Sequence, residues 1–132
     1  MVQVMRPARD IHLGSLIKTG GGYRGIFDIE LASGNYICGL KLDEADLWHL
    51  AQVDACVTIR VTRGAQDLVQ PHTAAANELV YSAHLNMAYI AGPGNWFRIA
   101  GRTDIKVEVS IDNVGDDIAN NIGVVLMEHG WK

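Results

Sequence analysis

The sequence predicts an all-β protein: an antiparallel sandwich of jelly-roll-like type with one short helix near residues 43–50. Segment after segment alternates apolar and polar residues with the period of a strand. Turn signals rich in Gly, Asn, Asp and Pro separate these segments roughly every ten residues. Strands do not alternate with long helices, which argues against a parallel sheet. An immunoglobulin-like sandwich is disfavoured because its Cys…Trp…Cys spacing is missing.

The first segment, residues 11–17, is short and apolar, and a glycine-rich stretch, residues 19–22, follows it. Three consecutive glycines have no side chains to pack, so they predict a flexible turn. A phosphate-binding loop would need a following Lys-Ser/Thr pair and a helix, and the sequence has neither at this point.

A β-hairpin is predicted over residues 23–42. Residues 25–31 place Phe27 and Ile29 on one face and polar residues on the other. Residues 32–35 are a turn of hairpin length, and an apolar strand returns after it.

The segment 43–50, DEADLWHL, breaks the strand pattern and predicts a helix of one to two turns. Asp43 is a suitable N-cap residue. Leu47 and Leu50, three residues apart, are expected to point inward.

The next strand, residues 55–62, alternates cleanly, but residues 63–77 have neither period. Pro71 interrupts this stretch, and Ala74 to Ala76 offer little surface to bury. We expect a loop that is mobile in the free subunit and becomes ordered against a neighbouring chain.

Residues 78–90 predict one long strand or two short ones, and residues 96–99 predict another. The stretch 92–95, Gly-Pro-Gly-Asn, is a strong turn signal between them. A further turn is expected at residues 101–103.

The C-terminal part predicts a hairpin: an alternating strand at 105–112, an acidic connection, and an apolar strand at 122–127. The unbroken apolar run is typical of a strand covered on both faces. Asp112, Asp116 and Asp117 could supply oxygens to a cation, but EF-hand spacing is absent, and Asp, Asn and Gly are common turn residues. We interpret the acidic stretch as a turn, with a cation site as the weaker alternative.

Length and charge limit the class of protein. The chain of 132 residues suits a single domain, 1–132, and its net charge of −4 argues against strong nucleic-acid binding. It has neither an apolar stretch long enough for a membrane span nor the apolar core of a signal peptide. Cys38 and Cys56 lack metal-binding spacing and are expected to be buried thiols.

Enzyme signatures do not stand out. The five histidines, His12, His49, His72, His84 and His129, are scattered, without the HxH pair of metal-binding cupins. The serines lack a GxSxG context, and carboxylates spaced by two, such as Asp28 and Glu30, occur on any half-exposed strand. We therefore expect no catalytic residue and no cofactor.

Large aromatic residues at the ends of elements indicate interfaces instead. Trp96 follows a turn signal, and Trp131 is next to the last residue. Together with Pro71 and His72 in the aperiodic stretch, they are the predicted interface residues.

The ending VEVSIDNVGDDIANNIGVVLMEHGW resembles the closing hairpin of small jelly-roll structural proteins of bacterial viruses. The resemblance covers about the last thirty residues. It implies a capsid, decoration, or head or tail accessory subunit that forms homo-oligomers and docks to other virion proteins. Such a protein would be assembled in the host cytoplasm and located in the virion.

Two alternatives stay open. One is a β-barrel enzyme or small-ligand binder in which histidines meet in the cavity. The other is a cellular adaptor or carbohydrate-binding domain that uses Trp48 or Trp96 as a stacking platform.

Overall fold

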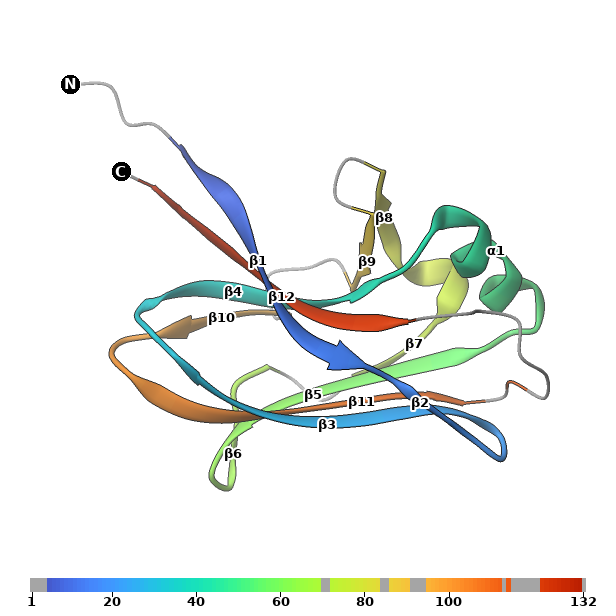
Figure 1. The fold of residues 1–132 in the computed structure, drawn as a ribbon, viewed down its shortest axis with the longest axis horizontal. Coiled ribbons are helices and arrows are strands. Elements are labelled where there is room, and N and C mark those ends of the chain that lie inside the picture. Colours follow the sequence, from blue (N-terminus) through green and yellow to red (C-terminus); the bar gives the residue numbers. More distant parts are fainter. Residues whose placement is uncertain are drawn as a thin grey trace.

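A computed structural model gives the fold of the chain (Figure 1). It describes residues 5–69, 72–83, 86–90, 95–112, 114 and 122–131. For residues 5–10, 72 and 129–131 it describes the backbone alone.

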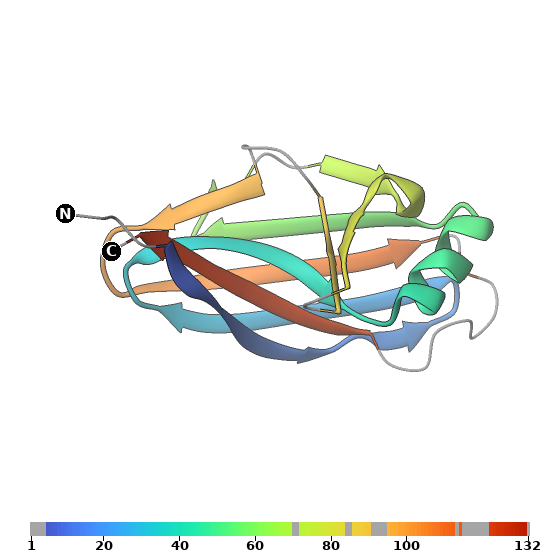
Figure 2. The ribbon, with the colours of Figure 1, turned by 90° about the horizontal axis from the view of Figure 1, so that it is seen from above.

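The described chain is mostly β, with two antiparallel sheets and one short α-helix, as the sequence predicts. Sheet A has the order β1 (Met5–Ser15), β12 (Gly123–Trp131), β4 (Gly34–Lys41), β9 (Met87–Tyr89), β8 (Val80–Ser82), and β10 (Trp96–Ile99) also pairs with β4. Sheet B has the order β2 (Ile17–Thr19), β3 (Gly22–Leu31), β11 (Thr103–Asp112), β5 (Cys56–Arg63), β6 (Gln66–Asp67), and β7 (His72–Ala75) also pairs with β5. Figure 2 shows the two sheets from above, with the helix at one end.

The hydrophobic core lies between the sheets and takes alternate residues from the longer strands of both. On β11 these are Ile105, Val107, Val109 and Ile111, all buried, while the residues between them are exposed or half-buried. The alternation predicted for residues 105–112 is therefore confirmed, because a strand sends successive side chains to opposite faces.

The predicted hairpin over 23–42 is wrong. β3 belongs to sheet B and β4 to sheet A, so the short connection between them crosses the sandwich. Tyr36, just after this crossing, is fully buried; its hydroxyl donates a hydrogen bond of 2.8 Å to the carbonyl oxygen of Ala32. The ring stacks on Phe97, with centroids 5.8 Å apart.

The predicted C-terminal hairpin is also wrong, for the same reason. β11 is central in sheet B, and β12 is central in sheet A between β1 and β4. The prediction that residues 122–127 form a covered strand is confirmed. Val124 and Leu126 belong to the main core, and Val125 and Met127 are buried in a second cluster.

Residues 63–77 are more ordered than their sequence suggests. They contain β6 and β7, and β7 pairs with β5 from His72 opposite Ile59 to Ala75 opposite Cys56. Ala74 and Ala76, expected to bury little, are both buried in the core. With two and four residues, β6 and β7 are too short to show a period in the sequence.

The helix α1 (Glu44–Gln52) is confirmed and is slightly longer than predicted. Asp43 occupies the N-cap position, but its side chain makes no capping hydrogen bond. Leu47 and Leu50 are buried as expected. A 3-10 turn, η1 (Ala76–Glu78), precedes β8.

Of the two arrangements predicted for residues 78–90, the pair of short strands is confirmed: β8 and β9 are separate strands that pair with each other. The glycine-rich stretch is the turn of the β2–β3 hairpin, with Thr19 opposite Gly22. The predicted turn at 92–95 lies outside the described residues except for Asn95.

Candidate functional site

The outward face of sheet A carries a second apolar cluster, separate from the core. Ile37, Met87, Val125 and Met127 are buried in it, and Tyr89 and Trp96 pack against them while half-buried. We call these six residues the outer cluster. An antiparallel sheet usually presents polar residues on its solvent face, whereas this face is apolar. Its four central side chains are 8% exposed or less, so within the outer cluster only Tyr89 and Trp96 offer apolar surface to solvent.

The strand register places the outer cluster in rows that run across the sheet. In one row Trp96 lies opposite Ile37, Ile37 opposite Met127, and Met127 opposite Asp10. Because directly opposed residues share a face, Trp96 of β10 and Met127 of β12 line the same surface, with Ile37 between them.

The neighbouring row has a glycine at its centre. Gly39 lies opposite both Val125 and Tyr89, and Val125 lies opposite His12. A Cβ atom on Gly39 would overlap the side chain of Met87, so the missing side chain lets Met87 lie over β4. Val80, 39% exposed, lies opposite Tyr89 at the margin of this row.

At the ends of β1 and β12 a two-stranded ribbon, residues 5–6 and 130–131, continues beyond β4. We call it the terminal ribbon. β4 pairs with β12 only as far as His129, whereas β1 continues to pair with β12 up to Met5 opposite Trp131. The first residues of β1 and the last residues of β12 therefore extend from the body side by side, as Figure 1 shows. In the described chain, β1 pairs with no strand other than β12.

The structure places the predicted interface residues on both sheets. Trp96 begins β10 and is part of the outer cluster. Trp131 ends β12 in the same sheet, described by its backbone alone. His72 begins β7 in sheet B, again with only its backbone described, and Pro71 lies outside the described residues.

The acidic stretch is only partly described. Asp112 is exposed at the end of β11, opposite Gly22 and Cys56, while Asp116 and Asp117 lie outside the described residues. Val114 is buried, and its N–H donates a hydrogen bond of 3.0 Å to the carbonyl oxygen of Gly21. Among the described residues, no group of three His, Cys, Asp or Glu side chains is arranged to hold a metal ion.

Two histidine side chains are described, on different elements. His12 lies on β1, at a hollow of about 500 Å³ that is also lined by Lys41, Asp46 and Asn86. His49 lies on α1 with its ring 5.6 Å from that of Trp48. Trp48 is 59% exposed and is absent from the residues that line the hollow, so it offers no stacking surface there.

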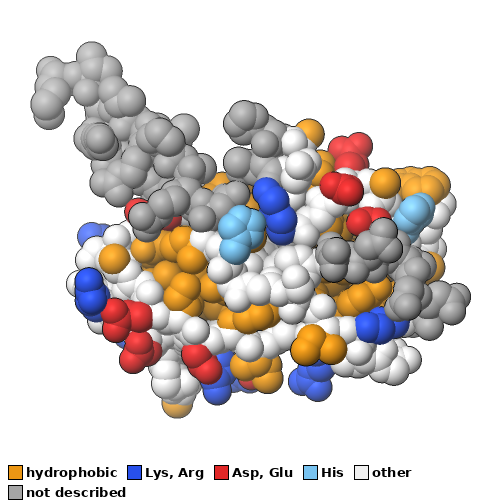
Figure 3. Space-filling model, viewed as in Figure 1, with side chains coloured by type: hydrophobic (Ala, Val, Ile, Leu, Met, Phe, Trp, Pro, Cys, Tyr) orange, Lys and Arg blue, Asp and Glu red, His pale blue; other side chains and the backbone are white. Residues whose placement is uncertain are grey.

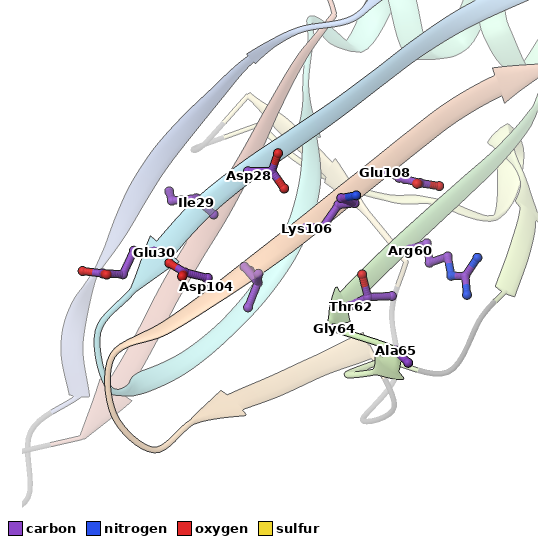
Figure 4. A pocket seen from close by; sticks show the side chains of 11 residues that line it. Asp28, Ile29, Glu30, Arg60, Thr62, Gly64, Ala65, Asp104, Lys106 and Glu108 are labelled. Atoms are coloured by element: carbon purple, nitrogen blue, oxygen red, sulfur yellow. The ribbon is translucent and has the colours of Figure 1, made fainter.

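The outward face of sheet B forms a polar hollow of about 690 Å³ (Figure 4). Lys106 lies between Asp28 and Thr62 of the adjacent strands. Glu30 lies opposite Asp104. The guanidinium of Arg102 donates a hydrogen bond of 3.2 Å to the carboxylate of Glu30. Charged side chains of both signs line these strands, as is usual for the solvent face of an antiparallel sheet.

The two cysteines differ in environment. Cys38 faces the core, and burial raises its pKa to about 12, so the thiol stays protonated at neutral pH. Cys56 is only half-buried at the start of β5, which corrects the expectation that both thiols are buried.

Hydropathy places no membrane-crossing helix in the described part of the chain.

Comparisons with protein family models, with curated proteins and with solved structures found no match to this chain.

Proposed function

We propose that the protein is a structural subunit that acts by self-association and by docking to neighbouring subunits. The observation that carries this proposal is the outer cluster. Its four buried apolar side chains lie on the outward face of sheet A, and two half-buried aromatic rings, Trp96 and Tyr89, pack against them. Large aromatic residues are among the side chains that most often dominate binding energy at protein interfaces.

The terminal ribbon supports the same function by a different route. An unpaired strand edge presents a row of N–H and C=O groups that another strand can bind. A two-stranded ribbon is only marginally stable by itself in water. A neighbouring subunit that pairs with β1 would satisfy these groups and stabilise the ribbon.

We further propose that the sandwich is a jelly roll. In a jelly roll the chain folds back on itself. The first main strand pairs with the last, the second with the last but one, and so on towards the middle of the chain. The pairs β1–β12, β3–β11, β4–β9 and β5–β7 follow that scheme, with β2, β6, β8 and β10 as short additions, and this supports the proposal.

The proposed setting is a virion. A jelly roll is used by capsid proteins but also by lectins and cupins, so the fold does not decide the function. The likeness of the C-terminal sequence to virion proteins favours the capsid, decoration or accessory role. The resemblance is to a closing hairpin, whereas here β11 and β12 lie in different sheets. The support that remains is the pairing of β12 with β1 and of β11 with β3, which follows the jelly-roll scheme.

The test compares two tryptophans that differ in packing. Light scattering over a range of concentrations should show oligomers for the wild-type protein. Trp96→Ala should weaken association by about 2 kcal/mol, roughly thirtyfold in the dissociation constant, if the ring anchors the contact. Trp48→Ala removes an equally large ring from α1 and should leave association unchanged. A wild-type protein that stays monomeric, alone and with co-expressed virion proteins, would overturn the proposal.

A further inference from the structure

We propose that β1 is exchanged between subunits, so that β1 of one copy completes sheet A of the next by pairing with its β12. This inference rests on the proposed self-association and specifies how it occurs. The exchanged segment fits its new position by construction, because the same pairing of β1 with β12 is present within the chain.

The first support is the connection between β1 and its own body. β1 ends at Ser15 in sheet A and β2 begins at Ile17 in sheet B, so Leu16 alone joins the two sheets. Leu16 is held in place by its N–H, which donates a hydrogen bond of 2.8 Å to the carbonyl oxygen of Ile122. A very short connection between two packed elements favours exchange, because extending it releases the constraint of a tight crossing.

The backbone just before this connection is also constrained. Gly14 has a φ of 151°, a conformation that residues with a side chain rarely adopt. A Cβ atom at Gly14 would lie 2.7 Å from the ring of Phe27 on β3. Residue 14 therefore lets the chain turn from sheet A towards sheet B within the sandwich.

The second support is that no side chain described on β1, in residues 11–15, is fully buried in its own subunit. Of its described side chains, Ile11 and Leu13 are half-buried, and His12 and Ser15 are exposed. Figure 3 shows hydrophobic side chains reaching the surface on this face of the molecule. Phe27 packs against the core while partly buried.

The pairing of β1 is therefore dominated by one partner strand. β1 pairs with β12 over most of its length, from Met5 opposite Trp131 to Ser15 opposite Gly123. Exchange keeps every one of these pairs and changes only the connection at Leu16. Such a swap links subunits at little energetic cost, since the same contacts form between chains as within one chain.

Disulfide trapping tests the exchange directly. Asp10 and Met127 lie opposite each other within a regular part of the β1–β12 pairing, so cysteines at both positions can form a disulfide. The experiment uses Asp10→Cys with Met127→Cys in a Cys56→Ser background; Cys38 is buried and stays in place. Exchange predicts that oxidation of the assembled protein links chains covalently on a non-reducing denaturing gel.

A matched pair in the body controls for accidental cross-linking. Ile26 and Glu108 lie opposite each other on β3 and β11, so Ile26→Cys with Glu108→Cys should form a disulfide within one chain. Co-expression of Asp10→Cys and Met127→Cys on separately tagged chains should give a mixed cross-linked dimer only if β1 is exchanged.

The outcomes separate this inference from the proposed function. Oligomers in which the 10–127 disulfide is intramolecular, with no mixed dimer, overturn the exchange and leave self-association standing. Failure of the 10–127 pair to oxidise at all overturns the pairing on which exchange depends. A wild-type protein that is monomeric by light scattering overturns both proposals.

Discussion

The hydroxyl of Tyr36 donates a hydrogen bond of 2.8 Å to the carbonyl oxygen of Ala32, four residues earlier, across the point where the chain passes from sheet B to sheet A. The bond fixes a crossing that has only two residues between β3 and β4. Tyr36→Phe keeps the ring that stacks on Phe97 and removes the donor. We expect the free energy of unfolding to fall by about 1 kcal/mol, measured from denaturant midpoints.

Tyr89→Phe is the matched control, because the Tyr89 hydroxyl makes no hydrogen bond among the described residues and the ring is likewise part of a packed cluster. Equal midpoints for Tyr36→Phe and the wild-type protein would show that the bond does not hold the crossing in solution.

The three glycines of the β2–β3 turn have different roles, and substitution separates them. A Cβ atom on Gly22 would overlap the backbone carbonyl of Ile111, whereas a Cβ atom on Gly20 meets nothing within 4 Å. Gly22→Ala should therefore destabilise the protein by about 2 kcal/mol or more, because the backbone of β11 has to move. Gly20→Ala should leave the melting temperature within a degree or two of wild type; a similar loss for both would mean that β3 and β11 are not in this register.

Val125 tests the double coverage of β12. It is fully buried in the outer cluster, so Val125→Asp places a carboxylate in an apolar site, at a cost of several kcal/mol. We expect loss of soluble yield and a large drop in the denaturant midpoint. Ile17→Asp makes the same chemical change at a side chain that is 73% exposed and should be tolerated. Tolerance of Val125→Asp would place the outward face of sheet A in solvent.

The buried thiol of Cys38 makes stability depend on pH at the alkaline end. Burial raises its pKa from 9.0 to about 12, so above pH 9 the unfolded chain loses the proton while the folded protein keeps it. The unfolded state then binds fewer protons, and the free energy of unfolding falls as pH rises from 9 towards 12. Cys38→Ala should show a shallower fall over this range in denaturant titrations, whatever its stability at neutral pH.

Thiol labelling gives an independent reading of the same burial. At pH 8 the folded protein should react at Cys56 and not at Cys38, and denaturant should expose the second thiol. Parallel slopes for wild type and Cys38→Ala, together with fast labelling of both cysteines, would contradict the burial of Cys38.

Most strands, and the apolar face of each, could be predicted from the amino-acid pattern alone. Alternation in 105–112 and the unbroken apolar run in 122–127 are consequences of the two-residue period of a strand, and burial on one or both faces follows directly. The helix near 43–50 was also predictable, because its leucines follow helical spacing.

Which strands are neighbours, in contrast, depends on tertiary packing. The two-residue period of a strand shows on which face a side chain lies, but not which strand is its neighbour. A turn that closes a hairpin and a turn that crosses between sheets therefore have similar sequences. For that reason β3–β4 and β11–β12 were predicted as hairpins and are crossings. The same limit applies to the candidate site: Trp96 was predicted as an anchor from its place at a turn, but Ile37, Val125 and Met127 become one outward surface with it only through the register of three strands distant in sequence.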